Sequence, residues 1–270
     1  MLHPLVGVAI LFRFNFMKIV TWNVNSVRAR LPHVEDFLKD QHPDVLLLQE
    51  LKCETQVFPY SLEDFGYNCA VFGQKTYNGV AILSKYPIED VQMGIPNFED
   101  VTSRYIEAFT NGVRVASIYV PNGQEVGSAA YDYKLNFFKA LYAHAQHLLT
   151  FDERVVIGGD FNVAPTDADV YDPIAWKEQV LCSTKEREAF RKIVYAGFTD
   201  AVAQSTKGSM PYTWWNYRQN GFVKGSGLRI DHLLLSPQAA DSLSRTEVHT
   251  YMRAKEKASD HAPVEVTLKI

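Results

Sequence analysis

The sequence is poor in cysteine, and the three cysteines that it has lie far apart. Cys53, Cys69 and Cys182 contain no CxxC pair, which is the spacing expected of a zinc site or a redox dithiol. Their number is odd as well, so a disulfide framework is not indicated. We therefore expect reduced thiols in a cytoplasmic protein.

An excess of charge of one sign is also lacking. Lys and Arg number 27 against 31 Asp and Glu, so the formal net charge of the 270 residues is −4. This balance neither supports nor excludes nucleic acid as a partner. Such a partner would have to bind a local basic patch.

A long hydrophobic run is absent too. The apolar part of the opening MLHPLVGVAILFRFNF is too short to span a bilayer, Arg13 follows it, and no small-residue cleavage site comes after it. The first regular pattern begins at Met17. We therefore predict that residues 1–16 are an extension outside the fold, with an extra edge strand as the alternative, and that residues 17–270 form one compact domain.

Two motifs of common enzyme classes do not occur. The sequence has no GxxxxGK[ST] phosphate cradle and no GxSxG elbow. Nucleotide triphosphatases of the P-loop type and serine hydrolases are therefore disfavoured.

Short apolar runs alternate with longer amphipathic segments through the rest of the chain. Helical spacing of apolar residues or a capping pattern predicts helices over residues 31–42, 131–149 and 183–197. The apolar runs that predict strands are 18–22, 45–48, 80–83, 113–120, 155–157, 230–235 and 264–270. The pattern indicates an α/β fold in which helices cover sheets.

Polar side chains stand at the ends of most of these strands. Each alone has an ordinary explanation, because Asn and Asp are common in turns. Together they offer several carboxylate and amide oxygens, which are the ligands that Mg²⁺ prefers, and a phosphoryl centre is the natural target of such a site. The residues are Asn23, Asn25, Glu50, Asp160, Asn162, Asp231, His232, Asp260 and His261.

Several ordered motifs also resemble a known family. WNVNSVRAR, LLLQELK, YNGVAILSK, IYVPNG, GGDFNVAPTD, LRIDHLLLS and SDHAPV are similar to the signature of the exodeoxyribonuclease III family of abasic-site (AP) endonucleases, within the endonuclease/exonuclease/phosphatase superfamily. The resemblance covers residues 17–270. It implies a four-layered α/β sandwich of two packed mixed β-sheets flanked by helices.

The resemblance also implies an activity. Members of the family are Mg²⁺-dependent phosphodiesterases of base excision repair, with Mn²⁺ as a substitute, that cut 5′ to abasic sites and clean 3′ termini. We accordingly expect a monomer that acts on double-stranded DNA with abasic sites, nicks or 3′ ends and has no membrane partner. The alternatives are a small-molecule or lipid phosphodiesterase on the same fold and a catalytically silent DNA-binding module.

Roles for individual residues follow from the resemblance by position. Glu50 is expected to be the principal metal ligand, and Asp160 to orient or deprotonate the attacking water. Asn162 and Tyr119 are expected to contact the scissile phosphate, as is His261, which Asp231 positions. The metal environment would also include Asn23, Asp160, Asn162, Asp260 and His261, with Asn25 beside the substrate.

A stretch without any acidic residue separates Asp200 from Asp231. Its basic residues (Lys207, Arg218, Lys224, Arg229) are interleaved with aromatic ones (Tyr212, Trp214, Trp215, Tyr217, Phe222), a pattern typical of contacts to backbone phosphates and bases. We expect Trp215 to be mainly in the core and Trp214 to face the site. By family resemblance, Trp214, Leu228 and Ile230 are the expected walls of an apolar slot for a base-less deoxyribose.

Three further residues are predicted to bind substrate. Arg28 and Arg30 are suited to a phosphate clamp. Tyr171 lies in ADVYDP between Pro165 and Pro173, where some relatives have a small residue. Its ring is expected either to stack on the base beside the cut, and so favour ends over internal abasic sites, or simply to pack on its loop for stability.

Overall fold

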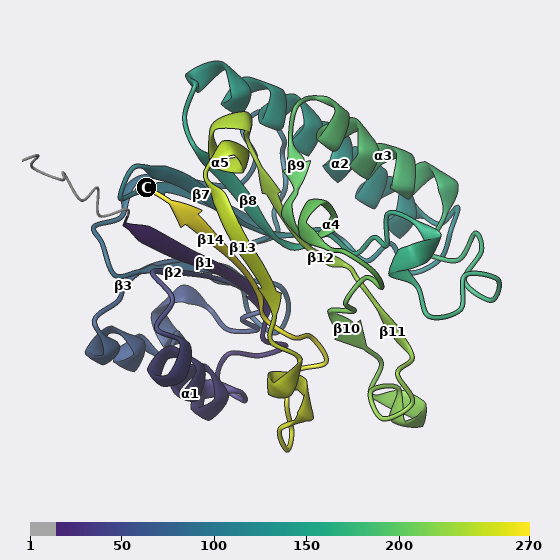
Figure 1. Cartoon of the computed structure of the whole chain (residues 1–270), viewed down its shortest axis with the longest axis horizontal. Helices are drawn as coiled ribbons and strands as arrows, with labels where there is room; N and C mark the ends of the chain where they lie inside the picture. The colour runs from purple at the N-terminus through teal and green to yellow at the C-terminus, as the bar shows by residue number, and fades with distance from the viewer. Residues whose placement is uncertain (1–14) are drawn as a thin grey trace, which may run out of the picture.

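The structure is a computed structural model and describes residues 15–270. Two mixed six-stranded sheets form its centre (Figure 1). The first sheet has the order β13 (Leu243–Val248), β14 (Val264–Lys269), β1 (Phe16–Asn23), β2 (Val45–Gln49), β4 (Val80–Ser84) and β3 (Asn68–Phe72).

The second sheet has the order β5 (Glu89–Met93), β6 (Tyr105–Thr110), β7 (Val113–Tyr119), β8 (Val155–Asp160), β12 (Asp231–Leu235) and β9 (Thr199–Asp200). Two strands pair in parallel in each sheet, β1 with β2 and β7 with β8. A separate two-stranded ribbon is formed by β10 (Trp214–Trp215) and β11 (Gly227–Leu228).

The helices lie outside the two sheets. α1 (Leu31–Gln41) packs on the first sheet, whereas α2 (Ala129–Leu148) and α3 (Thr184–Tyr195) lie side by side over the second (Figure 1). Two short helices, α4 (Ala201–Ser205) and α5 (Pro237–Asp241), follow β9 and β12. The architecture is the predicted four-layered α/β sandwich.

Three apolar interfaces hold these layers together. The inner faces of the two sheets meet in one cluster that includes Ile19 and Val156, because successive side chains along a strand point to opposite faces of its sheet. Phe37 of α1 packs against the outer face of the first sheet. Phe138 of α2 and Phe190 of α3 pack against the outer face of the second. The core therefore fixes the relative position of the strand ends, where the polar residues lie.

The elements predicted from apolar patterning are confirmed, with shifts of a few residues at their ends. The capping pattern at the third helix is present in full: the backbone N–H and the hydroxyl of Ser183 both donate to Glu186. The first strand begins at Phe16, which pairs with Lys269, one residue before the predicted domain start. The carbonyl of Asn15 accepts the backbone N–H of Ile270 at 2.9 Å, and residues 1–14 of the predicted extension lie outside the described residues.

Seven strands were not predicted: β3, β5, β6, β9, β10, β11 and β13. β5 and β13 have little apolar content, whereas β3 and β6 are mostly apolar. β5, with the sequence EDVQM, is exposed along its whole length at the edge of its sheet. Within residues 15–270, no helix is both long enough and apolar enough to cross a membrane. All three cysteines are free thiols, as predicted.

Candidate active site

The polar strand ends meet at one end of the sandwich. β1 and β2 run in parallel to Asn23 and Gln49, and β7 and β8 run in parallel to Tyr119 and Asp160. Asp231 opens the antiparallel strand β12 directly opposite Asp160. The carboxyl ends of parallel strands reach the same edge of a sheet, so both sheets deliver polar groups to one place.

Two glycines let β8 approach its neighbours closely. A Cβ on Gly159 would lie 1.9 Å from the carbonyl oxygen of Ile118, and one on Gly158 would lie 2.7 Å from side-chain atoms of Leu233 and Leu47. Both glycines are inside the strand, so they do not form a turn. They allow the close packing that places Asp160 at the strand end.

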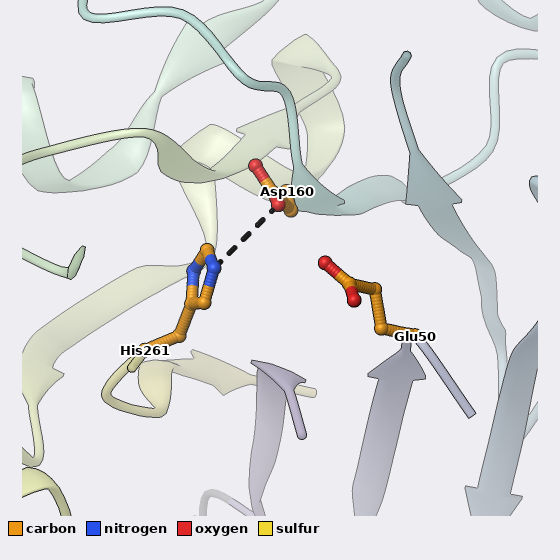
Figure 2. Close-up of side chains that lie close together, drawn as sticks. All are labelled: Glu50, Asp160 and His261. Carbon is orange, nitrogen blue, oxygen red and sulfur yellow. Dashed lines mark ion pairs between the residues drawn. The ribbon is translucent and has the colours of Figure 1, made fainter. Parts of the chain in front are cut away.

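Glu50, Asp160 and His261 point toward one another across this edge (Figure 2). One potential ligand atom from each lies within 4.8 Å of those from the other two. Glu50 comes from the end of β2 and has a positive φ of 53°. The carboxylates of Glu50 and Asp160 in this group could hold a metal ion, and they include the ligand predicted to be the principal one.

Asn23 lies between the two carboxylates. Its Nδ2 donates to Glu50 Oε1 at 3.0 Å and to Asp160 Oδ2 at 2.9 Å. Its Oδ1 accepts the backbone N–H of Asn25 at 3.0 Å. Asn23 therefore holds the two carboxylates in place, and the metal-ligand role predicted for it stays a prediction.

Asp160 is buried and short of positive charge. Burial, together with the nearby carboxylates of Asp231 and Glu50, raises its pKa to about 7, although the His261 imidazole acts in the opposite direction. Its Oδ1 accepts the backbone N–H of Asn162 at 2.8 Å. A carboxyl group with a pKa near neutrality is suited to take a proton from water at physiological pH.

His261 is held by Asp231, as the resemblance implied. Its Nδ1 lies 2.9 Å from Asp231 Oδ2, and its Nε2 faces Asp160 Oδ2 at 3.8 Å. Burial alone would lower the pKa of His261, but the carboxylates of Asp231 and Asp160 outweigh it and raise the pKa to about 10. The ring is therefore an imidazolium at neutral pH, with Nε2–H directed into the site.

The donor set fits a hard divalent cation. Three carboxylates, from Glu50, Asp160 and Asp231, converge on a single imidazolium, and Lys52 pairs with Glu50 Oε2 at 2.8 Å while it also donates to Asn25 Oδ1. Buried carboxylates are costly unless a cation or hydrogen bonds compensate them. Mg²⁺ takes oxygen ligands, of which the protein usually supplies only one or two carboxylates and water supplies most of the others.

Glu50, Asp160 and His261 line a pocket of about 320 Å³, here called the catalytic pocket. Tyr119 closes one wall: its hydroxyl is hydrogen-bonded to Glu50, and its pKa lies well above the ordinary value because of burial and the charges of Glu50 and Asp160. The Arg104 guanidinium stacks 4.7 Å from the Tyr119 ring centroid. Tyr119 is therefore a neutral hydrogen-bond donor at the pocket.

Asn162 forms the base of the pocket beside Asp160. Its backbone has a positive φ of 49°, and its Oδ1 accepts a hydrogen bond from Asn122 Nδ2 at 3.0 Å while its Nδ2 donates to the Val120 carbonyl at 3.0 Å. These bonds fix the amide and leave one N–H for a ligand. The amide oxygen already accepts one hydrogen bond within the protein, and the metal-ligand role predicted for Asn162 stays a prediction.

A buried lysine holds the two loops that carry these asparagines. Lys134 of α2 is fully buried and donates to the carbonyls of Asn162 at 2.6 Å and Asn122 at 3.1 Å. It also pairs with Glu186 of α3, which is fully buried as well. A Cβ on Gly123 would lie 3.0 Å from the Lys134 stem, so the loop needs glycine there. Sequence patterning gave no sign of this pair.

Asp260 lines the opposite side of the catalytic pocket. Its Oδ1 accepts from Asn25 Nδ2 at 2.8 Å, and its Oδ2 accepts from Trp214 Nε1 at 3.0 Å. It stands outside the close group of Glu50, Asp160 and His261. Its place is therefore at the edge of the predicted metal environment, where it fixes the Trp214 ring.

The predicted phosphate clamp has two unlike members. Arg28 is exposed. Arg30 donates to the carbonyl of Asn25 at 2.7 Å and to the hydroxyl of Tyr217 at 3.0 Å. Arg30 thus ties the loop after β1 to the loop after β10, whereas Arg28 is available to solvent.

The residues of the acid-free stretch between Asp200 and Asp231 lie in different environments in the structure. Trp215 is buried and Trp214 faces the catalytic pocket, as predicted. Ile230 lines that pocket, but Leu228 is packed behind it in a small apolar cluster. The expectation that Arg229 forms part of a basic surface is wrong: it is buried and pairs with Asp169 and Asp200, both at 2.7 Å.

Two aromatic residues of the loop after β8 lie at the rim. Tyr171 is 43% exposed and borders a second pocket adjacent to the catalytic one. Trp176 lines both pockets. Trp176 was not predicted, because it stands in a segment without regular periodicity, and only its nearness to Tyr171 and Pro173 in the sequence could have drawn attention to it.

The chain is similar in sequence to known proteins. The Endonuclease/Exonuclease/phosphatase family matches residues 20–261. The chain is 32% identical to exodeoxyribonuclease III of Haemophilus influenzae over 265 residues, which is 92% of this chain and 98% of that protein.

Solved structures resemble the fold over almost the whole described chain. The 3′-5′ exonuclease NExo from Neisseria meningitidis is 44% identical with a TM-score of 0.92, and a variant described as 3′ phosphatase NExo, bound to product DNA hairpin, is 43% identical with the same score; each match covers 94% of this chain and 100% of the other. An AP endonuclease from Archaeoglobus fulgidus is 35% identical with a TM-score of 0.91 at the same coverage.

Proposed function

Because the chain belongs to the exodeoxyribonuclease III branch of the Endonuclease/Exonuclease/phosphatase family, we propose that it is a metal-dependent DNA repair nuclease that uses Mg²⁺ and acts chiefly on 3′ termini. The observation that carries the proposal is the group of Glu50, Asp160 and His261, with ligand atoms within 4.8 Å, at the base of a pocket. The relatives described as a 3′-5′ exonuclease and a 3′ phosphatase support the preference for ends.

The chain's own residues divide the work of phosphodiester hydrolysis. When bound, Mg²⁺ neutralises charge on the phosphate and lowers the pKa of a bound water. Glu50 would hold the cation, and Asp160 would accept the proton of the attacking water, in keeping with its pKa of about 7. Asn23 keeps the two carboxylates apart and aligned.

Three hydrogen-bond donors in the catalytic pocket are placed to interact with the negative charge of the phosphate. His261 offers Nε2–H, Tyr119 its hydroxyl and Asn162 its remaining amide N–H to the phosphate oxygens. Donors fixed before the substrate arrives stabilise the negative charge that develops in the transition state. His261 is fixed from behind by Asp231, and Asn162 by Asn122. The Tyr119 hydroxyl is hydrogen-bonded to Glu50 and would turn from that carboxylate to a phosphate oxygen.

Substrate contacts extend from this centre. Arg28 and Arg218 are exposed beside it, and positive charge there suits DNA phosphates. Trp214 and Ile230 form an apolar wall for the deoxyribose on the 3′ side of the cut. Tyr171 at the rim crowds the path of an uninterrupted duplex, which favours nicks and recessed or frayed 3′ ends over internal abasic sites.

Hydrolysis of three duplexes tests the proposal. One carries an internal abasic site, one a nick with a 3′-phosphate, and one a recessed 3′ end, each assayed with Mg²⁺ and with chelator. We expect Mg²⁺-dependent activity on all three, higher on the two 3′ termini, and none from Glu50→Gln. Activity that survives chelation, or hydrolysis of a nucleotide-free phosphodiester in preference to DNA, would exclude the proposal.

Tyr171→Gly examines the preference for ends separately. We expect the ratio of abasic incision to 3′-end removal to rise, with an unchanged melting temperature as the control. An unchanged ratio in a stable variant would mean that the Tyr171 ring only packs on its loop.

A further inference from the structure

A second pocket of about 290 Å³, here called the side pocket, adjoins the catalytic pocket. Trp176 and Trp214 line both, so the two cavities share a wall of indole rings. Trp214 is held by the hydrogen bond from its Nε1 to Asp260 at 3.0 Å, and its ring centroid lies 6.5 Å from that of His261. A group in the side pocket would therefore lie next to the scissile phosphate.

The lining of the side pocket differs from that of the catalytic pocket. It includes the rings of Tyr171, Trp176 and Trp214, the cations Arg218 and Lys224, and no acidic residue. Neither cation forms an ion pair with any residue of the described chain. The catalytic pocket, by contrast, contains three carboxylates.

A pocket lined by aromatic rings beside unpaired cations favours a particular class of ligand. Flat π-systems stack on indole and phenol rings, and Arg and Lys attract phosphate or the electron-rich edge of a base. Small-molecule sites begin at about 300 Å³, so this cavity suits one base or nucleoside and excludes a base pair. The ligand class that meets all three conditions is a single unpaired nucleobase attached to a phosphodiester.

The position of the cavity decides which base can reach it. The proposed position of the sugar on the 3′ side of the cut is against Trp214, and Trp214 also lines the side pocket. A base inside a duplex is stacked and paired, so it cannot enter without a cost of a few kcal/mol. A frayed or mismatched base at a 3′ terminus has already left the stack.

We propose that the side pocket binds the unpaired base of the 3′-terminal nucleotide that the enzyme removes. This inference rests on the proposed function and names a substrate feature of the same site. An abasic sugar and a 3′-phosphate have no base, so neither fills the pocket. The side pocket therefore contributes to removal of a terminal nucleotide and not to removal of a terminal phosphate.

Two variants alter the side pocket without touching the catalytic residues. Ser226→Leu places a larger side chain in the lining, because Ser226 is half-buried there. Lys224→Gln removes an exposed charge. Lys192→Gln makes the same charge change at an exposed site on α3 and serves as the matched control. Melting temperatures confirm that each variant folds.

The first measurement compares two reactions on one duplex, which ends either in an unpaired 3′ adenosine or in a 3′-phosphate. Stacking of one base is worth about 1–3 kcal/mol, which is roughly 5- to 150-fold. We expect Ser226→Leu to lower nucleotide removal about tenfold or more and to leave phosphate removal within about twofold. Lys224→Gln should show the same selectivity with a smaller loss, and Lys192→Gln no change. An equal effect of Ser226→Leu on both reactions, or none, would overturn the proposal.

The second measurement needs no hydrolysis. Calorimetry in chelator compares binding of a duplex with an unpaired 3′ adenosine to one with an abasic residue at that position. We expect the wild type to favour the adenosine by about tenfold and Ser226→Leu to bind both equally. Equal binding by the wild type would refute the side-pocket assignment. Base-dependent binding without any hydrolysis would instead refute the proposed function and leave the assignment standing.

Discussion

Two groups of carboxylates lie on opposite sides of β12, and they differ in how their negative charge is compensated. The Asp160 group consists of Glu50, Asp160, Asp231 and His261. The Arg229 group consists of Asp169, Asp200, Arg229 and His232. β8, which carries Asp160, pairs with one edge of β12, and β9, which carries Asp200, pairs with the other.

In the Arg229 group, residues of the protein itself compensate the negative charge of the carboxylates. The guanidinium donates to Asp169 and Asp200 at 2.7 Å, and His232 bonds the carbonyl of Val163 at 2.9 Å. Burial would raise the pKa of Asp200, but the Arg229 guanidinium outweighs it and holds the pKa well below its ordinary value. The Asp200 carboxylate is therefore stabilised as an anion without any ligand.

In the Asp160 group, the protein supplies fewer positive charges than there are carboxylates. Its three carboxylates share one imidazolium and one half-exposed lysine, and the pKa of Asp160 rises to about 7. Similar side chains thus produce a structural ion-pair network on one side of β12 and a site that accepts a cation on the other. What separates them is the presence of an arginine, which cannot lose its charge.

The largest expected effect is on turnover. Glu50→Gln and Asp160→Asn should each lower Mg²⁺-dependent hydrolysis of a recessed 3′ end by roughly a thousandfold or more, because cation binding or water activation is lost. Circular dichroism should show an unchanged fold. Near-full activity of either variant would contradict the roles assigned to these carboxylates.

Arg229→Met should act on stability instead. It leaves Asp169 and Asp200 as unpaired buried charges, and removal of one partner of a buried pair costs about 3–5 kcal/mol. Urea denaturation measures the loss. Arg245→Met, which breaks an exposed pair with Glu247, should cost no more than about 1 kcal/mol. Equal losses in the two variants would show that burial of the Arg229 group is not decisive.

Lys134 offers an intermediate case, because its buried pair also holds the catalytic loops. Lys134→Met should destabilise the fold by about 3–5 kcal/mol through the unpaired Glu186. Lys134→Met/Glu186→Gln removes both charges and keeps the helix cap, so most of that stability should return. Turnover should stay down by about tenfold, since the Asn162 and Asn122 carbonyls have lost their donor. Full turnover in the double variant would make the pair purely structural.

The smallest expected effect is a dependence of stability on pH. Because the folded pKa of Asp160 is about 7 against an ordinary 3.8, the folded state binds more protons than the unfolded one between these values, and wild-type stability falls as pH rises through that window. In chelator, Asp160→Asn should therefore melt higher than the wild type at pH 8 and lose this advantage towards pH 4. Each kcal/mol corresponds to about 2–4 °C. A lower melting temperature for the variant at pH 8 would show that the Asp160 charge is already satisfied.

The sequence predicted the strand ends well because local rules govern them. Apolar runs mark β2 and β8, and a polar residue directly after a buried strand must lie at the edge of the sheet. Glu50 and Asp160 were therefore placed correctly. The family resemblance supplied what local rules could not, namely that His261 and Asp231 would be partners from distant strands.

Other features depend on contacts that no local pattern records. Arg229 counted as a surface cation in the sequence, yet Asp169 and Asp200, which bury and neutralise it, come from elements 60 and 29 residues away. Trp176 lies in an irregular loop, and Lys134 occupies an ordinary position in a helix. Such residues are recognised only when the tertiary structure shows what surrounds them.

Calorimetric titration with Mn²⁺ tests the central claim most directly, namely that the Asp160 group accepts a cation that the protein itself does not supply. We predict one Mn²⁺ site in the wild type, displaced by Mg²⁺, absent in Glu50→Gln, and retained in Asp167→Asn, which changes an exposed carboxylate paired with Arg187. Equal Mn²⁺ binding by the wild type and Glu50→Gln would contradict the account.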